Sequence, residues 1–393
     1  MRQYLGYTAI IIGIIIFISV LYINNGYNGV TRPFSNYTLL TSSWEKYKRQ
    51  FINGDGRVID YGNNSLTTSE GQSYALLRAV WVDDKQAFDQ IWKWTRENLK
   101  RPGDYLFGWR WGKKPDGSFG FLSGGGNNSA SDADTDIALA LILADRRWHV
   151  TTYDRDAQNI LGDIWGKEVA TVSGNFYVTA GNWAQNDKEV VINPSYFAPY
   201  AWRIFAQTDK KPEHRWNDLI GPAYGLLEEV SRDPLDKSVS AGLPPDWIVV
   251  DRTTGKPRAP DIPSLTTNYS FDAMRIPWRI ALDWEWNHEP QALSYLQNNF
   301  GRLLSDFNHN GKLATSYAHD GTVLNGHESP AMYATAIGYF LAVHPLLAKR
   351  IYDEKIVRLY SNDTNSFNSE LPYYDQNWLW FGAALYAKAL DHY

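Results

Sequence analysis

Cysteine is absent from all 393 residues, and this absence removes several kinds of chemistry at once. Without thiols the chain can form no disulfide bond and has neither a thiolate nucleophile nor a cysteine ligand for zinc or an iron–sulfur cluster. Basic residues are not in excess either, because 38 Lys and Arg stand against 43 Asp and Glu, which gives a formal net charge of −5. Surfaces that bind nucleic acids normally need a basic excess, so we expect no nucleic-acid partner.

The sequence also lacks the short motifs of several common enzyme classes. It contains no H-E-x-x-H zinc motif, no G-x-S-x-G elbow and no Walker loop, and its 8 histidines are scattered. Asp306–Gly311 begins like a calcium loop, but Tyr317 occupies the last ligand position, where such loops have Glu, so a turn is the better interpretation. We therefore expect no metal and no cofactor.

Long apolar runs are absent apart from one near the N-terminus. Residues 5–23 read LGYTAIIIGIIIFISVLYI, and at about 1.5 Å per helical residue they nearly span a bilayer core of about 30 Å. A cleaved signal peptide is the alternative, but its apolar region is shorter, about 7–15 residues, and ends in small residues, whereas Asn24-Asn25 follow here. We predict an uncleaved signal anchor, with residues 1–4 in the cytoplasm because Arg2 lies on that side. Residues 24–35 are predicted to be a linker to a domain outside the cell.

No second linker, low-complexity tract or charge block follows, so we expect one domain over residues 36–393. Its hydrophobic periodicity is mostly helical; Asp84, for example, can cap a helix over residues 85–99. Loops rich in Gly, Asn and Pro separate roughly ten or more such segments, which predicts an all-α bundle or ring of helical hairpins. Residues 169–180 and 247–252 look β-like and predict minor strands.

Aromatic residues are abundant, with 17 Trp and 25 Tyr, and several stand beside acidic residues. Trp and Tyr combine a broad apolar face with a polar atom, which suits a wet binding cleft as well as a core. The stretch Thr67–Tyr74 places Glu70 at the start of a helical run. Ordinary helix capping would account for Glu70, but Gly71 would also let a substrate approach closely.

Two more acidic stretches follow along the chain. The helix predicted to begin near residue 131 has three carboxylates at its start: Asp132, Asp134 and Asp136. One carboxylate would satisfy the helix dipole, and three repel one another. Asp272 and Arg275 lie one helical turn apart. They form either a surface ion pair or an ionised base whose pKa the arginine lowers.

Together these stretches resemble glycoside hydrolase family 8, which includes bacterial endoglucanases, cellulose-synthase-associated cellulases, xylanases and chitosanases. Residues 130–148, ASDADTDIALALILADRRW, are similar to the family signature over their whole length. Weaker matches occur in the expected order at residues 67–74, 109–114, 193–196 and 373–375. The resemblance covers about residues 40–390 and implies an (α/α)6 barrel, in which an outer ring of helices surrounds an inner ring.

The resemblance also implies roles for single residues. Glu70 matches the family's proton donor, and Asp132 matches the aspartate that holds the central sugar. Asp272 matches the general base of the subfamily that keeps Asp on this helix, whereas other subfamilies place the base elsewhere. The family often has Tyr immediately before this base, whereas this chain has Phe271 and so lacks that hydroxyl. The other substrate-binding candidates are aromatic residues and the arginine beside the base: Trp109, Trp111, Trp183, Tyr196, Tyr374 and Arg275. Trp202 lies within a helical stretch, and we expect it in the core.

These roles imply inverting hydrolysis inside a polysaccharide chain. Glu70, whose pKa is expected to be raised by burial and by Asp132, would protonate the leaving oxygen. Asp272, kept ionised by Arg275, would activate a water molecule on the opposite face of the sugar. Inversion then predicts that the two carboxyl groups lie roughly 6.5–9.5 Å apart.

The polymer itself stays open at this point. β-1,4-Glucan is the family's commonest substrate, but xylan, chitosan and another β-1,4-linked amino-sugar exopolysaccharide are alternatives. A predicted anchor at the cell membrane suggests action on the cell's own exported polysaccharide. An exopolysaccharide synthase complex is then an expected partner. We expect the protein itself to be a monomer. A non-catalytic polysaccharide-binding or assembly protein is a further alternative, although the presence of both Glu70 and Asp272 argues against it.

Overall fold

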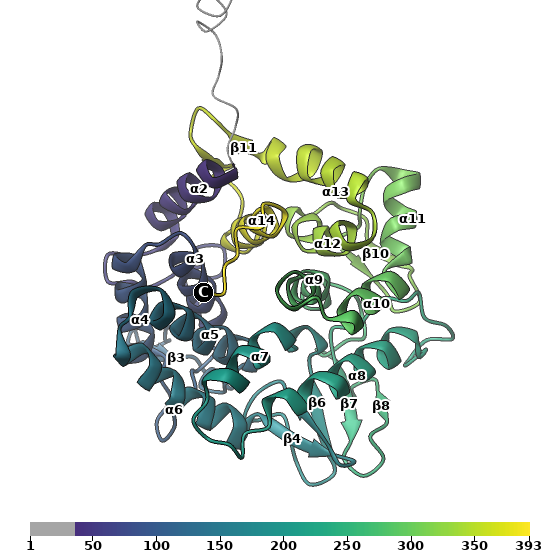
Figure 1. Ribbon diagram of the computed structural model, residues 1–393, viewed down its shortest axis with the longest axis horizontal. Coiled ribbons are helices and arrows are strands. Elements are labelled where there is room, and N and C mark those ends of the chain that lie inside the picture. The colour runs from purple at the N-terminus through teal and green to yellow at the C-terminus, as the bar shows by residue number, and fades with distance from the viewer. Residues whose placement is uncertain (1–35) are drawn as a thin grey trace, which may run out of the picture.

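Helices dominate residues 36–393, which are the residues that the computed structural model describes. Figure 1 shows them as two concentric rings, an arrangement consistent with the predicted (α/α)6 barrel. The inner ring contains α3 (Ser69–Trp81), α5 (Ser131–Trp148), α7 (Pro199–Thr208), α9 (Ile276–Asn287), α12 (Pro330–Val343) and α14 (Tyr373–Tyr386). The outer ring contains α2 (Asn36–Phe51), α4 (Lys85–Asn98), α6 (Thr151–Lys167), α8 (Ile220–Arg232), α10 (Pro290–Asn298), α11 (Gly301–Asn310) and α13 (Pro345–Ile351).

The two rings differ in the way their side chains are buried. Inner helices are buried on all sides: every residue of α5 from Ser131 to Ala144 is buried, and so is every residue of α12 from Ala331 to Phe340. Outer helices are amphipathic, as in α4, where Phe88 and Ile91 are buried. The predicted cap of α4 is confirmed, because Asp84 Oδ1 accepts the N–H of Ala87 at 3.1 Å. Helices that are apolar all round need a second layer to cover them, which the outer ring provides.

Short strands lie in the connections between helices, as predicted for residues 169–180 and 247–252. They form small antiparallel sheets, of which two hold site residues. One sheet joins β1 (Thr67–Thr68), β2 (Arg110–Lys113) and β3 (Phe119–Phe121), and the other joins β6 (Glu189–Ile192), β7 (Ile248–Asp251) and β8 (Pro257–Arg258). The other strands pair two by two: β4 (Val169–Val172) with β5 (Asn175–Val178), β9 (Ser316–Tyr317) with β10 (Val323–Asn325), and β11 (Tyr360–Ser361) with β12 (Ser366–Phe367).

The region that resembled a calcium loop is the end of a helix. α11 runs to Asn310, and Gly311 follows it with a φ of 65°, a left-handed conformation that suits glycine. Within residues 36–393 no group of three or more acidic or histidine side chains is arranged to hold a metal ion.

Among the residues described here, no helix is both long and apolar enough to cross a membrane. The predicted anchor at residues 5–23 and the predicted linker at residues 24–35 lie outside the described residues.

Candidate active site

The predicted acidic residues lie at the N-terminal ends of inner-ring helices. Glu70 is in the first turn of α3, and Asp132 is in the first turn of α5. Asp272 precedes the short helix η3 (Ala273–Arg275), which leads directly into α9. Backbone N–H groups at these helix ends lack partners within their own helices and favour negative charge nearby. The barrel therefore brings three acidic side chains that are distant in sequence to one place.

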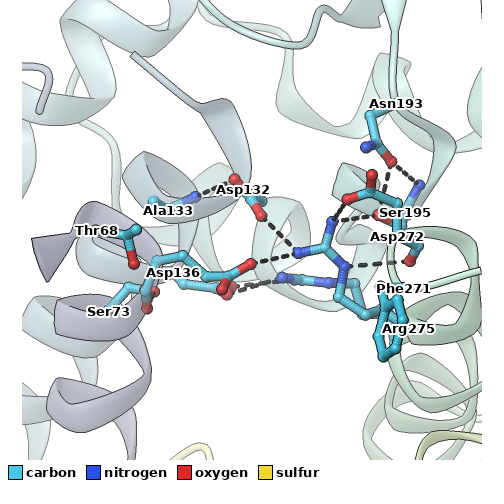
Figure 2. Close-up of polar contacts among 12 residues, drawn as sticks. Thr68, Ser73, Asp132, Ala133, Asp136, Asn193, Ser195, Phe271, Asp272 and Arg275 are labelled. Carbon is cyan, nitrogen blue, oxygen red and sulfur yellow. Dashed lines mark hydrogen bonds and ion pairs between the residues drawn. The ribbon is translucent and has the colours of Figure 1, made fainter. Parts of the chain in front are cut away.

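Arg275 connects these three carboxylates. Its side chain is 1% exposed, and its Nη1 donates to Glu70 Oε2 at 2.8 Å and to Asp132 Oδ2 at 3.0 Å. Its Nη2 donates to Asp272 Oδ1 at 2.6 Å and to the hydroxyl of Ser195 at 2.8 Å. Figure 2 shows the guanidinium group between Asp132 and Asp272. The predicted pairing of Arg275 with Asp272 is confirmed, but the arginine is shared with two more carboxylates.

This shared arginine limits the distance between the two predicted catalytic carboxyl groups. Glu70 contacts one terminal nitrogen of Arg275 and Asp272 contacts the other. Given the fixed, planar guanidinium group, the two nearest carboxylate oxygens can be no more than about 8 Å apart. This limit leaves room for two carboxyl groups that act on opposite sides of one glycosidic bond.

Burial controls the protonation of Glu70. It raises the pKa of Glu70 to about 7; the neighbouring charge of Arg275 opposes the shift, whereas Asp132 and Asp272 add to it. A carboxyl group with this pKa keeps its proton for a substantial fraction of the time near neutral pH, as a general acid requires. The expected direction of the shift is confirmed, with burial as its first cause and Asp132 as a smaller one.

The charge of Arg275 lowers the pKa of Asp272, as predicted, but burial has the larger effect. Burial raises the pKa of Asp272 above its usual value, and Arg275 opposes this rise without cancelling it. The physical reason is that burial outweighs the charge of Arg275, and the charge of Asp132 adds to the rise. Asp272 is nonetheless the more accessible of the two predicted catalytic groups, with a side chain 32% exposed against 23% for Glu70.

The second oxygen of Asp272 has its own donor. The indole N–H of Trp247 donates to Asp272 Oδ2 at 3.0 Å. Trp247 immediately precedes β7, and Ser195 follows β6, so the paired ends of these strands place both residues beside Asp272. Neither residue was among the site residues predicted from the sequence, although Ser195 lies within the run at residues 193–196.

A pocket of about 540 Å³ lies beside Asp272. Three aromatic residues predicted to bind sugar line it, namely Trp109, Trp183 and Tyr196, together with Trp247. Trp109 is 36% exposed and Trp183 is 39% exposed, so each offers free ring surface to a ligand. The pocket falls within the usual range for small-ligand sites, about 300–1,000 Å³, and broad aromatic faces suit the apolar faces of sugar rings.

Two other tryptophans have different roles. Trp111 does not line this pocket; it packs edge-on against Trp94 and stacks on Phe119, at centroid distances of 5.1 and 5.3 Å. The prediction that Trp111 belongs to the cleft is therefore not supported, because its neighbours attach the β2–β3 hairpin to α4. Trp202 is 1% exposed and belongs to the core, as expected.

Tyr374 contacts the segment that carries Asp272. It lies in the first turn of α14, and its hydroxyl donates to the carbonyl oxygen of Phe271 at 2.7 Å. The rings of Tyr374 and Phe271 meet edge to face at 6.1 Å, and Phe271 is 48% exposed. The residue that replaces the family's usual tyrosine thus presents an apolar ring to the solvent next to Asp272.

The other two aspartates at the start of α5 have partners away from Asp272. Asp136 forms a buried ion pair with Arg279, at 2.8 Å. Asp134 accepts the N–H of Phe107 at 2.9 Å, and burial together with the nearby carboxylate of Glu168 raises its pKa well above the usual value. The three carboxylates of this helix start therefore serve three separate networks.

Comparisons with known proteins show the family of the chain. The sequence matches the profile of Glycosyl hydrolases family 8 over residues 18–379. It is 30% identical over 336 residues to Endoglucanase A of Acetivibrio thermocellus, an alignment that covers 81% of this chain and 64% of that protein. The chain thus spans just under two thirds of the length of this curated relative.

Solved structures show the same architecture. The endo-1,4-D-glucanase from Vibrio fischeri ES114 superposes with a TM-score of 0.72 at 26% identity, covering 88% of this chain and 94% of that one. A family 8 xylobiose complex from Teredinibacter turnerae shares the fold at 17% identity, with a TM-score of 0.70 over 91% of this chain and 95% of that one. Since the family profile covers most of its length, the chain belongs to glycosyl hydrolase family 8.

Proposed function

We propose that this protein is an inverting, endo-acting glycoside hydrolase that cleaves β-1,4-linked glucan. The observation that carries the proposal is the meeting of Glu70 and Asp272 on one guanidinium group beside an aromatic pocket. Membership of the family and the names of its relatives, which are endoglucanases, support the same reaction.

In the proposed reaction, Glu70 is the general acid and Asp272 is the general base. Glu70 transfers its proton to the glycosidic oxygen as the bond from that oxygen to the anomeric carbon breaks. A water molecule attacks this carbon from the opposite face, and Asp272 accepts a proton from the water. The configuration at the anomeric carbon is inverted, and both carboxyl groups then exchange protons with solvent before the next cycle. In this scheme Asp132, which accepts a hydrogen bond from Arg275, binds hydroxyls of the sugar at the cleavage point.

The charge of the pocket favours a neutral sugar. Of the described residues that line it, none is Lys or Arg, and Asp272 is its one ionisable carboxylate. A uronic acid would therefore find no cation there, and a cationic amino sugar would pair with the carboxylate that must act as the base. Glucan or xylan satisfies these conditions better than chitosan does.

The decisive experiment measures the products formed from a panel of soluble β-linked polymers. With hydroxyethyl cellulose we expect viscosity to fall faster than reducing ends appear, which is the mark of internal cleavage. Proton NMR of early products should show the α-anomer; the β-anomer would mean retention and would remove Asp272 from the role of base. Xylan and chitosan in the same panel test the alternative substrates.

Single substitutions test the assignment of the acid. Glu70→Gln should lower kcat by at least about 10²–10⁴-fold, since that is the usual contribution of a positioned proton transfer. Glu45→Gln is a matched control, because the Glu45 side chain is 52% exposed on α2, and it should retain full activity. Activity that survives in Glu70→Gln would exclude Glu70 from the mechanism.

We also propose that residues 5–23 anchor the enzyme in the cell membrane, with the hydrolase domain outside the cell. The proposal rests on the uncharged apolar run in the sequence. Full-length protein should pellet with membranes and resist extraction by carbonate, whereas a chain that begins at residue 36 should not. Extraction of the full-length chain by carbonate would contradict the anchor.

A further inference from the structure

The segment Ser270–Ala273, which carries Asp272, is held by a buried carboxylate from another part of the chain. Asp246 is 3% exposed, and its Oδ1 accepts the N–H of Ser270 at 3.1 Å and the N–H of Ala273 at 2.7 Å. Its Oδ2 accepts the hydroxyl of Ser270. Because Asp272 lies between these two residues, Asp246 fixes the backbone on both sides of it.

The residue after Asp246 holds the side chain of Asp272 itself. Trp247 donates its indole N–H to Oδ2 at 3.0 Å, while Arg275 donates to Oδ1 at 2.6 Å. Each carboxylate oxygen therefore has one fixed donor, which restricts rotation of the carboxylate about its last torsion. Backbone and side chain of Asp272 are thus held from the same dipeptide, residues 246–247.

That dipeptide is itself supported by regular structure. Ile248, the first residue of β7, pairs with Ile192 at the end of β6. Just before it, the N–H of Asp246 donates to the carbonyl of Asn268 at 2.7 Å, and the N–H of Trp247 donates to that of Thr266 at 3.0 Å. Groups supported by strands keep their positions better than groups on unsupported loops.

We propose that Asp246 is a positioning residue that acts through Asp272, with Trp247 orienting the carboxylate. The inference rests on the proposed role of Asp272 as general base. A base must direct a lone pair at the attacking water, and a displacement of about 1 Å can cost about 10²-fold in rate. Asp246 does not line the pocket beside Asp272, so its effect on the reaction passes through the segment that it holds.

The shape of Asp246 matters in this role more than its negative charge. An asparagine in its place keeps a carbonyl oxygen for the two N–H donors, and its amide N–H can donate to the Ser270 hydroxyl, which also accepts hydrogen bonds. Burial, and secondly the charge of Asp272, raise the pKa of Asp246 to about 7, so a protonated form is accessible in which Oδ2 donates to the same hydroxyl. The contact exists in both protonation states.

Two substitutions of Asp246 separate positioning from mere stability. Asp246→Ala should lower kcat about 10–100-fold with KM changed less than about threefold, and Asp246→Asn should restore kcat to within about fivefold of the wild type. A kcat within twofold of wild type in the folded Asp246→Ala variant would overturn the proposal. So would an Asp246→Asn variant as slow as Asp246→Ala, because charge and not shape would then be what matters.

The chain offers a matched control far from the site. Trp216 donates its indole N–H to the buried Asp209 at 2.8 Å, the same kind of contact as that between Trp247 and Asp272. Trp247→Phe should lower kcat, whereas Trp216→Phe should lower the melting temperature with kcat unchanged. Equal kcat losses in the two variants would mean that general destabilisation causes the effect.

A double-substitution cycle shows whether Asp246 acts through the base. In an Asp272→Ala background, Asp246→Ala should cause no further loss of the residual rate. Independent losses that multiply would contradict the proposal.

Hydrogen exchange supplies a readout that needs no activity: the amide of Ala273 should lose protection in Asp246→Ala and keep it in Asp246→Asn. If the wild type cleaves no polymer, the proposed function fails, while the exchange data still decide whether Asp246 holds this segment.

Discussion

Replacing Arg275 by methionine should destabilise the protein in a manner that depends on pH. Methionine has a similar length and no charge, so Arg275→Met leaves Glu70, Asp132 and Asp272 without their shared cation. Removing one partner of a buried ion pair typically costs about 3–5 kcal/mol, because a buried charge is left uncompensated. We therefore expect the free energy of unfolding to fall by about 4 kcal/mol at pH 8.

The cost should be smaller in acid. Arg275 is the strongest influence that lowers the pKa of both Glu70 and Asp272, so its loss raises both values further above those of the unfolded chain. A carboxyl group whose pKa is raised by folding contributes most stability below its unfolded pKa, and this contribution is lost as pH rises through the folded value. At pH 5 the carboxyl groups of the variant take up protons, and the loss should shrink to about 2 kcal/mol, which reflects the missing hydrogen bonds.

Urea unfolding followed by tryptophan fluorescence, at pH 5 and at pH 8, measures this difference for the wild type and the variant. Arg350→Met is a suitable control, because Arg350 pairs with Glu354 where both side chains are 50% exposed. It should change stability by less than about 1 kcal/mol at either pH. An equal loss in Arg275→Met at both pH values would refute the view that uncompensated carboxylates cause the instability.

Three further predictions concern the pH profile, the pocket and the core. The pKa of Glu70, raised to about 7, predicts that kcat/KM falls as pH rises through about 7, which a pH–rate profile measures. Trp109→Ala should raise KM about tenfold through loss of a stacking face, whereas Trp111→Ala should leave KM unchanged and lower stability by about 2–3 kcal/mol. The buried carboxyl groups of Asp134 and Glu168 both have raised pKa values, that of Glu168 to about 7, so stability should decline from about pH 4.5 to about pH 7. Glu168→Gln should flatten this decline in thermal unfolding curves, and an unchanged slope would exclude the pair as its source.

The sequence predicted those parts of the site whose signal is local. Asp272 and Arg275 are three residues apart, so helical spacing alone predicted that their side chains lie close together. The contacts of Arg275 with Glu70 and Asp132 bridge 205 and 143 residues, and no local pattern could indicate them. The order of the helices along the chain does not show which helix ends meet in the folded barrel.

Site residues that the sequence analysis did not predict were missed because their contacts are also distant in sequence. Trp247 contacts Asp272 across 25 residues, and its place just before β7 looked like an ordinary strand start. Trp111 shows a different limit of sequence reasoning. Its charged and glycine neighbours made it look exposed, but they do not reveal which face of a short strand turns toward α4. Helices of both rings were predicted from their hydrophobic pattern. Inner helices such as α12, expected near residues 328–343, are buried on every side, so the pattern predicts a helix without showing which of its faces contacts which neighbour.

The distribution of charge around Arg275 explains how two similar carboxyl groups can take opposite roles. With Glu70, Asp132 and Asp272 all ionised, the cluster around this one arginine would carry a net charge of −2 in a largely buried place, which is costly. One retained proton reduces that charge. Of the two proposed catalytic groups, Glu70 retains it more easily, because its carboxyl group is less exposed than that of Asp272 and its pKa is raised to about 7. Asp272 keeps a donor on each oxygen, which stabilises its ionised form. The proposed acid and the proposed base are therefore distinguished by how burial and donors are divided between them, and Arg275 couples the two protonation states because it contacts both.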